Sequence, residues 1–186
     1  MSDTDRPTTW HRGDWMQTYT GRQFYPMDPH PNDVDRVDIA HALSLLCRYN
    51  GHVQRFYSVA EHCVLMSEAV APEHALWALL HDATEAYVGD MIRPLKRSMP
   101  DYRAAEDRVM RAIAARFVIP DAMPAEVKDA DNRILLTERD ALMPPSGHAW
   151  GQDGLAPLPV TIHAWTPHVA EARYLDRLVS LTGVTS

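Results

Sequence analysis

The stretch that decides the fold is Ala75–Asp90, ALWALLHDATEAYVGD, in which an apolar run passes directly into ionisable residues. We predict a continuous, buried central helix over about residues 73–88, because the first half of this segment is almost entirely apolar. His81, Asp82 and Glu85 follow that apolar half at spacings that let all three project from one side of a helix. Buried carboxylates need a compensating charge, and a metal ion would supply it.

Helical periodicity continues on both sides of this stretch. It begins at Asp33, in a first helix that Gly51 would end. The sequence from Ser58 to Glu61 fits a capping box that opens a second helix. Amphipathic patterns predict further helices over about residues 101–117 and 125–142, and from Thr166-Pro167 onward.

Two short segments carry β-prone residues. Met16–Tyr25 is compatible with a small hairpin and equally with an irregular arm, and Val160–Trp165 has the composition of a short strand that would lie beside it. We therefore predict an all-α fold, a helical bundle with a small β element from the N-terminal arm and the C-terminal tail. One domain is expected over residues 1–186, with an arm over 1–32, a core over 33–142 and a C-terminal loop and helix over 143–186.

Composition excludes several classes of protein. The chain has 186 residues, 46% of them hydrophobic, which is enough for a core, and its net charge of −7 disfavours binding to a nucleic acid polymer. Its apolar runs are far shorter than the ~20 residues of a membrane span. No secretory signal is visible, and the two cysteines, Cys47 and Cys63, form no disulfide framework. We expect a cytoplasmic protein.

Two residues outside the central stretch could complete a metal site. His62 follows the capping box, and Asp131 lies four residues from both Val127 and Leu135, near the apolar face of its helix. With His81-Asp82 they would supply four ligands from three helices to one metal ion, with room left for water. Taken alone, a histidine such as His62 is more often a core or partly exposed residue than a ligand, and Asp131 could be a helix-face charge paired with Arg133 or Lys128. Mixed imidazole and carboxylate ligands suit one divalent ion, with Co, Mn, Zn, Fe, Ni and Mg all open.

On these residues the sequence resembles the HD-domain metal-dependent phosphohydrolases, whose signature is His…His-Asp…Asp, over roughly residues 39–142. The segments 58–62, 81–85, 89–90 and 94–96 are most similar to bacterial 5′-deoxynucleotidases and to the related phage dATP triphosphohydrolases. The resemblance implies an all-α fold, a homo-oligomer and the metal ligands His62, His81, Asp82 and Asp131. It also implies that Glu85, with Asp82, acts in catalysis by handling a proton or the attacking water, and that Asp90 contacts the sugar. Arg48-Tyr49 lies near the position of an Arg-aromatic pair in that family.

The chemistry of phosphate ester hydrolysis gives these residues roles. It needs a water molecule that the metal activates and cations that stabilise the phosphoryl oxygens. Lys96, Arg48 and Arg55 are candidates for these cations. For each of them, the alternative is an ordinary solvated charge on the surface. Tyr49 could stack on a base or belong to the core. Glu85 could instead hold a hydrogen bond to a ligand histidine.

Two other histidines lie in this region of the sequence. His41 is expected to be structural, and His52 is left open. The remaining histidines have no partner pattern and are expected to be exposed or packing residues.

Several functions fit this pattern. The first is release of phosphate from deoxynucleoside 5′-monophosphates by attack of the metal-activated water. The alternative is release of triphosphate from a dNTP, because Arg93, Lys96 and Arg97 cluster after Asp90. Hydrolysis of another phosphorylated metabolite is third. A non-catalytic, metal-containing nucleotide sensor is the reading from a different class, and a purely structural helical protein is the weakest.

Overall fold

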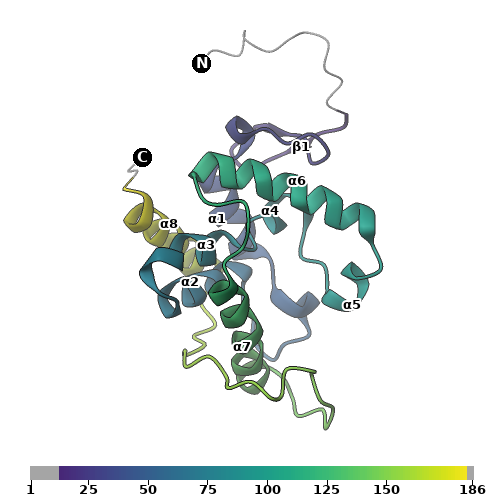
Figure 1. Cartoon of the computed structure of the whole chain (residues 1–186), viewed down its shortest axis with the longest axis vertical. Coiled ribbons are helices and arrows are strands. Elements are labelled where there is room, and N and C mark those ends of the chain that lie inside the picture. Colours follow the sequence, from purple (N-terminus) through teal and green to yellow (C-terminus); the bar gives the residue numbers. More distant parts are fainter. Residues whose placement is uncertain (1–12, 184–186) are drawn as a thin grey trace.

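Helices dominate the fold, as the sequence predicts. The structure is a computed structural model that describes residues 13–183 (Figure 1). Its α-helices are α1 (Arg36–Leu45), α2 (Val59–Ala69), α3 (Ala75–Leu80), α4 (Glu85–Val88), α5 (Arg93–Lys96), α6 (Pro100–Phe117), α7 (Ala125–Leu142) and α8 (Pro167–Thr182). The short 3-10 helices are η2 (Pro31–Asp33), η3 (Arg48–Gly51) and η4 (Pro72–His74). None of the helices in the described residues is long and apolar enough to cross a membrane.

The β element is a hairpin in the arm. Strands β1 (Met16–Gln17) and β2 (Gln23–Phe24) pair antiparallel, which confirms the hairpin reading of this segment. The hairpin turn is fixed to α1, because the backbone N–H and the hydroxyl of Thr20 donate to the Asp38 carboxylate at 2.7 and 2.9 Å. Phe24 then stacks on Tyr87 with ring centroids 3.8 Å apart, so the hairpin covers part of the core.

The strand predicted over Val160–Trp165 is wrong, since this segment has no regular secondary structure. Its last three backbone N–H groups, those of His163, Ala164 and Trp165, donate to the carboxylate of Glu61 on α2 at 2.6–2.9 Å. Those donors are therefore not available to pair with the arm, and the small β element comes from the arm alone.

The core lies where α1, α2, α3 and α8 pack against one another (Figure 1). Its larger cluster joins apolar side chains of these helices, including Ile39, Val64, Leu80 and Tyr174. A second cluster lies between α7 and the α2–α3 pair and includes Ile134. Helix α3 contributes to both clusters, so the apolar run of the sequence is buried as predicted.

The continuous helix predicted over residues 73–88 is wrong in its middle. Helix α3 ends at Leu80, and residues 81–84 form tight turns before α4 starts at Glu85. The Nδ1 atom of His81 donates to the carbonyl of Ala78 at 2.7 Å, so an imidazole occupies an acceptor that the backbone would use in a regular helix. The apolar periodicity does not reveal this side-chain bond.

The first helix also ends earlier than predicted. Helix α1 stops at Leu45, and Gly51 instead closes η3. Within η3, Tyr49 and Asn50 adopt left-handed conformations with φ of 57° and 51°, which are unusual for residues other than glycine. The backbone N–H of Arg48 donates to the carbonyl of Tyr57 at 3.0 Å, which draws this segment against the start of α2.

Candidate metal centre

Donor atoms of the four predicted ligands converge on one point. Nε2 of His62 lies 3.1 Å from Nε2 of His81, 3.5 Å from Oδ2 of Asp82 and 3.9 Å from Oδ1 of Asp131. Nε2 of His81 lies 3.2 Å from the same oxygen of Asp82. Donor atoms bound to one ion at about 2.1 Å lie roughly 3.0–3.4 Å apart at right-angled or tetrahedral bond angles. The distances of 3.1 and 3.2 Å lie in this range, and those of 3.5 and 3.9 Å lie above it. His62, His81 and Asp131 form a buried group that could hold a metal ion, and Asp82 adjoins it beside His81.

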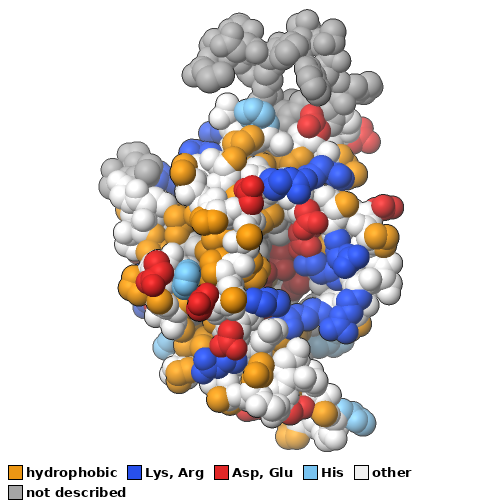
Figure 2. Space-filling model, in the orientation of Figure 1, with side chains coloured by type: hydrophobic (Ala, Val, Ile, Leu, Met, Phe, Trp, Pro, Cys, Tyr) orange, Lys and Arg blue, Asp and Glu red, His pale blue; other side chains and the backbone are white. Residues whose placement is uncertain are grey.

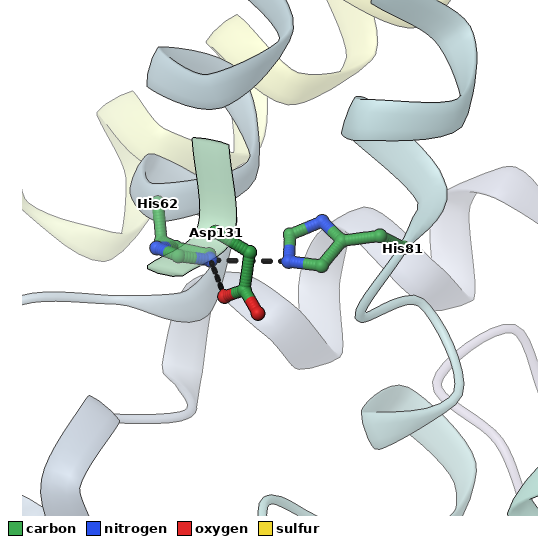
Figure 3. Close-up of side chains that lie close together, drawn as sticks. All are labelled: His62, His81 and Asp131. Atoms are coloured by element: carbon green, nitrogen blue, oxygen red, sulfur yellow. Dashed lines mark hydrogen bonds and ion pairs between the residues drawn. The ribbon is translucent and has the colours of Figure 1, made fainter. Parts of the chain in front are cut away.

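The ligands come from three separate parts of the fold. His62 extends from α2, His81 from the turns after α3, and Asp131 from α7 (Figure 3). Asp82 follows His81 in the same turns. His62, His81 and Asp131 are buried, so an ion here would compensate carboxylate charge that water reaches poorly. The tight turns after α3 are what present His81 and Asp82 next to each other at this point.

Each histidine donates a hydrogen bond from its other ring nitrogen, Nδ1, to an acceptor in the protein. Nδ1 of His62 donates to Glu138 at 2.6 Å, and Nδ1 of His81 donates to the carbonyl of Ala78. These acceptors select the tautomer whose Nε2 is free to bind a metal ion. Burial, followed by the positive charge of Arg48, lowers the pKa of His62, which favours the neutral form that a metal requires.

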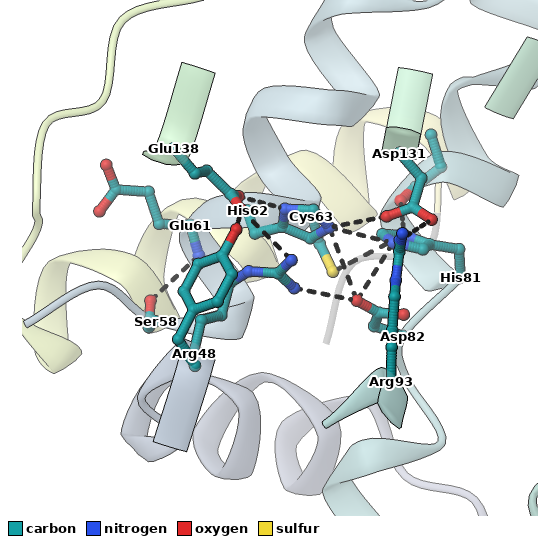
Figure 4. Close-up of polar contacts among 12 residues, drawn as sticks. Arg48, Ser58, Glu61, His62, Cys63, His81, Asp82, Arg93, Asp131 and Glu138 are labelled. Carbon is teal, nitrogen blue, oxygen red and sulfur yellow. Dashed lines mark hydrogen bonds and ion pairs between the residues drawn. The ribbon is translucent and has the colours of Figure 1, made fainter. Parts of the chain in front are cut away.

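Glu138 is a residue of the candidate site that the sequence analysis did not single out. Its carboxylate is fully buried and accepts hydrogen bonds from His62 and Tyr49, and it pairs with Nη2 of Arg48 at 3.3 Å (Figure 4). Burial alone would raise the pKa of Glu138, but Arg48, His62 and the hydrogen bonds lower it to about 2. The available signal was its position seven residues after Asp131, two turns along the same face of α7.

Cations pair with both predicted ligand carboxylates, on the oxygen that faces the histidines in Asp82 and on the outer oxygen in Asp131. Nη1 of Arg48 lies 3.3 Å from Asp82, and Asp131 receives Nη2 of Arg93 and Nζ of Lys128 at 2.8 Å each through Oδ2 (Figure 4). Oδ1 of Asp131 is thereby left to face the histidines. Burial would raise the pKa of both carboxyl groups, but the nearby histidines and arginines lower it.

Three of the predicted ligands, His81, Asp82 and Asp131, line a cavity of about 840 Å³. Figure 2 shows Lys and Arg side chains gathered around a hollow in which acidic side chains lie. The lining includes eight of the nine predicted site residues, all except the fully buried His62: Arg48, Tyr49, His81, Asp82, Glu85, Asp90, Lys96 and Asp131. The structure thus brings the predicted ligands and the predicted substrate residues to one place.

Glu85 and Asp90 stand out in the cavity wall by their surroundings. Oε2 of Glu85 is buried and has no hydrogen-bond partner within residues 13–183. Burial, with the charges of Asp82 and Asp90, raises the pKa of Glu85, and burial also raises the pKa of Asp90. Neither carboxyl group forms a hydrogen bond with His62 or His81. The alternative role for Glu85, as the hydrogen-bond partner of a ligand histidine, is therefore not supported. Glu138 occupies that role for His62.

The cationic candidates differ in their surroundings. Arg48 is buried, and Lys96 pairs with Glu106 at 2.5 Å while still lining the cavity. Arg55 is exposed and does not line it.

The other histidines stay outside the site. His52 is exposed and does not line the cavity. His41 pairs with Glu171 at 3.2 Å and stacks on Tyr19, a structural role as expected. No other histidine within residues 13–183 lines the cavity, and His11 lies outside the described residues.

The fold and site define a mostly α-helical protein with a buried His/Asp cluster able to hold a metal ion. The chain belongs to the family of the uncharacterized protein YfdR of Escherichia coli K12, to which it is 43% identical over 136 residues, 73% of this chain and 76% of that protein. It is also 39% identical over 126 residues to an uncharacterized protein of Rhodobacter capsulatus, covering 62% of this chain and 64% of the relative. No family model matches the chain.

Proposed function

We propose that this protein is a metal-dependent phosphohydrolase of the HD-domain type that releases phosphate from deoxynucleoside 5′-monophosphates. The observation that carries the proposal is the convergence of His62, His81, Asp82 and Asp131 at the wall of a cavity that cations also line. A purely structural helix bundle does not account for this set. Arg48, Arg93 and Lys128 already pair with its carboxylates, yet Nε2 of His62 still faces Nε2 of His81 and Oδ1 of Asp131.

The residues around the cavity have different roles in the proposed hydrolysis. A bound divalent ion supplies charge for the phosphoryl oxygens and lowers the pKa of water. Arg93, Lys96 and Lys128 bind the phosphate through charge-assisted hydrogen bonds, and Asp90 binds the sugar. Glu85 orients the attacking water by accepting its proton. The water oxygen bonds to phosphorus as the bond to the 5′ oxygen breaks, and that oxygen takes up the proton.

A second substrate class is favoured by the number of cations. Four of them, Arg93, Lys96, Arg97 and Lys128, line the cavity in addition to Arg48. A triphosphate carries more negative charge than a monophosphate and uses more of these partners. Release of triphosphate from a dNTP is therefore the second candidate.

Two further properties belong to this proposal. Cys47 and Cys63 are both free, which suits the reducing environment of the cytoplasm. The resemblance to the nucleotidases supports a homo-oligomer.

The test is a substrate panel on metal-free protein that is reloaded separately with Mn, Co, Mg and Zn. Phosphate and triphosphate release would be measured from ribo- and deoxynucleoside mono- and triphosphates. Phosphate from deoxynucleoside monophosphates, lost in Asp82→Ala but kept in the control Asp176→Ala, is the expected result. Asp176 suits the control because it is exposed on α8 and does not line the cavity.

Metal content separates the remaining outcomes. His81→Ala should lose stoichiometric metal, whereas His168→Ala, an exposed histidine of α8, should keep it. Triphosphate release from dNTPs would favour the second candidate. A protein that binds metal and nucleotide without turnover would be a sensor, and a protein without stoichiometric metal would contradict the enzyme proposal altogether.

A further inference from the structure

The loop over residues 143–158 forms part of the cavity wall and carries none of the predicted metal ligands or phosphate-binding residues. It leaves α7 at its C-terminal end and returns beside it (Figure 1). Arg139 bonds to Asp153 at 2.5 Å, Thr137 donates to the carbonyl of Leu158 at 2.7 Å, and Arg133 donates to the carbonyl of Ala156 at 2.9 Å. These anchors fix an irregular segment on the helix that carries Asp131 and Glu138.

The loop places three side chains in the cavity lining, those of Met143, Trp150 and Gln152. Trp150 is half-buried and is held from two sides. Its backbone N–H donates to Asp153 at 2.7 Å, and the guanidinium of Arg139 lies over its ring, 5.9 Å from the centroid. The indole is thus oriented by the loop anchors although it lies outside both core clusters.

Trp150 is also connected to the metal centre through two residues, Tyr49 and Glu138. Its ring lies 6.0 Å from the ring of Tyr49. Tyr49 in turn donates to Glu138, which holds His62. The side-chain amide of Gln152 makes no hydrogen bond within the described part of the chain, so this group is available to a ligand. Two side chains, Tyr49 and Glu138, therefore link Trp150 to His62 at the candidate metal centre.

We propose that Trp150 is a specificity-determining residue that stacks on the nucleobase of the substrate. The proposal rests on the proposed function, because it assigns the base end of the same nucleotide. Of the two tryptophans in the lining, Trp77 is buried in the second core cluster, whereas Trp150 is half-buried and lies outside both clusters, so the indole of Trp150 is the one available to a base. Stacking on an aromatic face tolerates different bases, so this wall favours nucleotides over other phosphate esters.

The experiment compares substrates with and without a base. The ratio of kcat/KM for a deoxynucleoside monophosphate to kcat/KM for 2-deoxyribose 5-phosphate would be measured in wild type and variants. Trp150→Ala should lower this ratio roughly tenfold through KM for the nucleotide, and Trp150→Phe should lower it less. Trp15→Ala is the matched control, since Trp15 is exposed in the arm and does not line the cavity, and it should leave the ratio unchanged.

Equal loss on both substrates in Trp150→Ala would overturn the proposal and make Trp150 a structural residue, as would an unchanged ratio. A wild-type protein without nucleotide turnover would instead contradict the proposed function. Calorimetric binding of the nucleotide would then decide on Trp150 separately. If Trp150→Ala binds the nucleotide more weakly than wild type while Trp15→Ala binds it as wild type does, the proposed base contact stands. If both variants bind it equally, the proposal is overturned.

Discussion

Glu138 accepts a hydrogen bond of 2.6 Å from Nδ1 of His62, and both side chains are fully buried. This pair joins a carboxylate to the metal-facing histidine of α2. Such a partner fixes the orientation of the ring and raises the basicity of the nitrogen that binds the metal. The site therefore depends on a residue that has no donor atom at its centre.

The first prediction concerns metal affinity. Glu138→Gln keeps an oxygen that can accept the bond from His62 but removes the charge, so we expect metal affinity to fall about 10–100-fold. Calorimetric titration of the metal-free protein with Mn or Zn measures this directly. The control is Glu68→Gln, an exposed position on the same helix as His62. An affinity equal to wild type would show that Glu138 only fills space.

The second prediction is a loss of stability in acid. The pKa of Glu138 is about 2 in the folded protein, below its ordinary value of 4.5, so the folded state favours the ionised form. This stabilisation is present above about pH 4.5 and is lost as the pH falls toward 2. It amounts to something on the order of 3 kcal/mol. Urea unfolding at several pH values should show a smaller change across this window in Glu138→Gln than in wild type.

The helices and the ligand set were accessible from the sequence because their signals are local. Helix α7 has the predicted bounds, since Val127, Ile134 and Leu142 repeat at helical spacing and all face the core. The four predicted ligands are of types that bind divalent metals, and His81 and Asp82 directly follow the most apolar run of the chain. Their order in the chain, together with the resemblance to the HD-domain phosphohydrolases, predicted that they would lie close together.

The missed features depend on contacts between distant segments. Glu138 looks like a solvated helix charge until Arg48 and Tyr49, from η3, are placed against it. Glu61 fits a capping box, and Ser58 does cap the backbone N–H of Glu61. The carboxylate of Glu61, however, is taken by backbone groups about a hundred residues later in the chain. No local pattern reports such a pairing.

The third prediction follows from that contact of Glu61. Its fully buried carboxylate accepts three backbone hydrogen bonds and holds Ala164 in a left-handed conformation with φ of 57°. Glu61→Ala leaves three donors without a partner, so we expect the free energy of unfolding to fall by roughly 3–5 kcal/mol. Glu61→Gln should lose less, because its one amide oxygen still accepts.

Denaturant unfolding of both Glu61 variants measures this effect. Glu68→Gln, on the exposed face of α2, should stay within about 0.5 kcal/mol of wild type. Equal stability of Glu61→Ala and wild type would mean that the segment over residues 163–165 is held to α2 by other contacts.

The last prediction is a stabilising substitution at the end of α6. Val118 follows this helix in a left-handed conformation with φ of 56° and is 89% exposed, so its side chain gains little from packing. A β-branched residue is strained there by about 1–2 kcal/mol, whereas glycine adopts this conformation freely. After the larger entropy of glycine in the unfolded chain is subtracted, Val118→Gly should stabilise the protein by about 0.5–1 kcal/mol. Ala172→Gly, at an exposed position inside α8, should instead destabilise it by about 1 kcal/mol, and thermal unfolding that shows the same sign for both variants would contradict the left-handed cap.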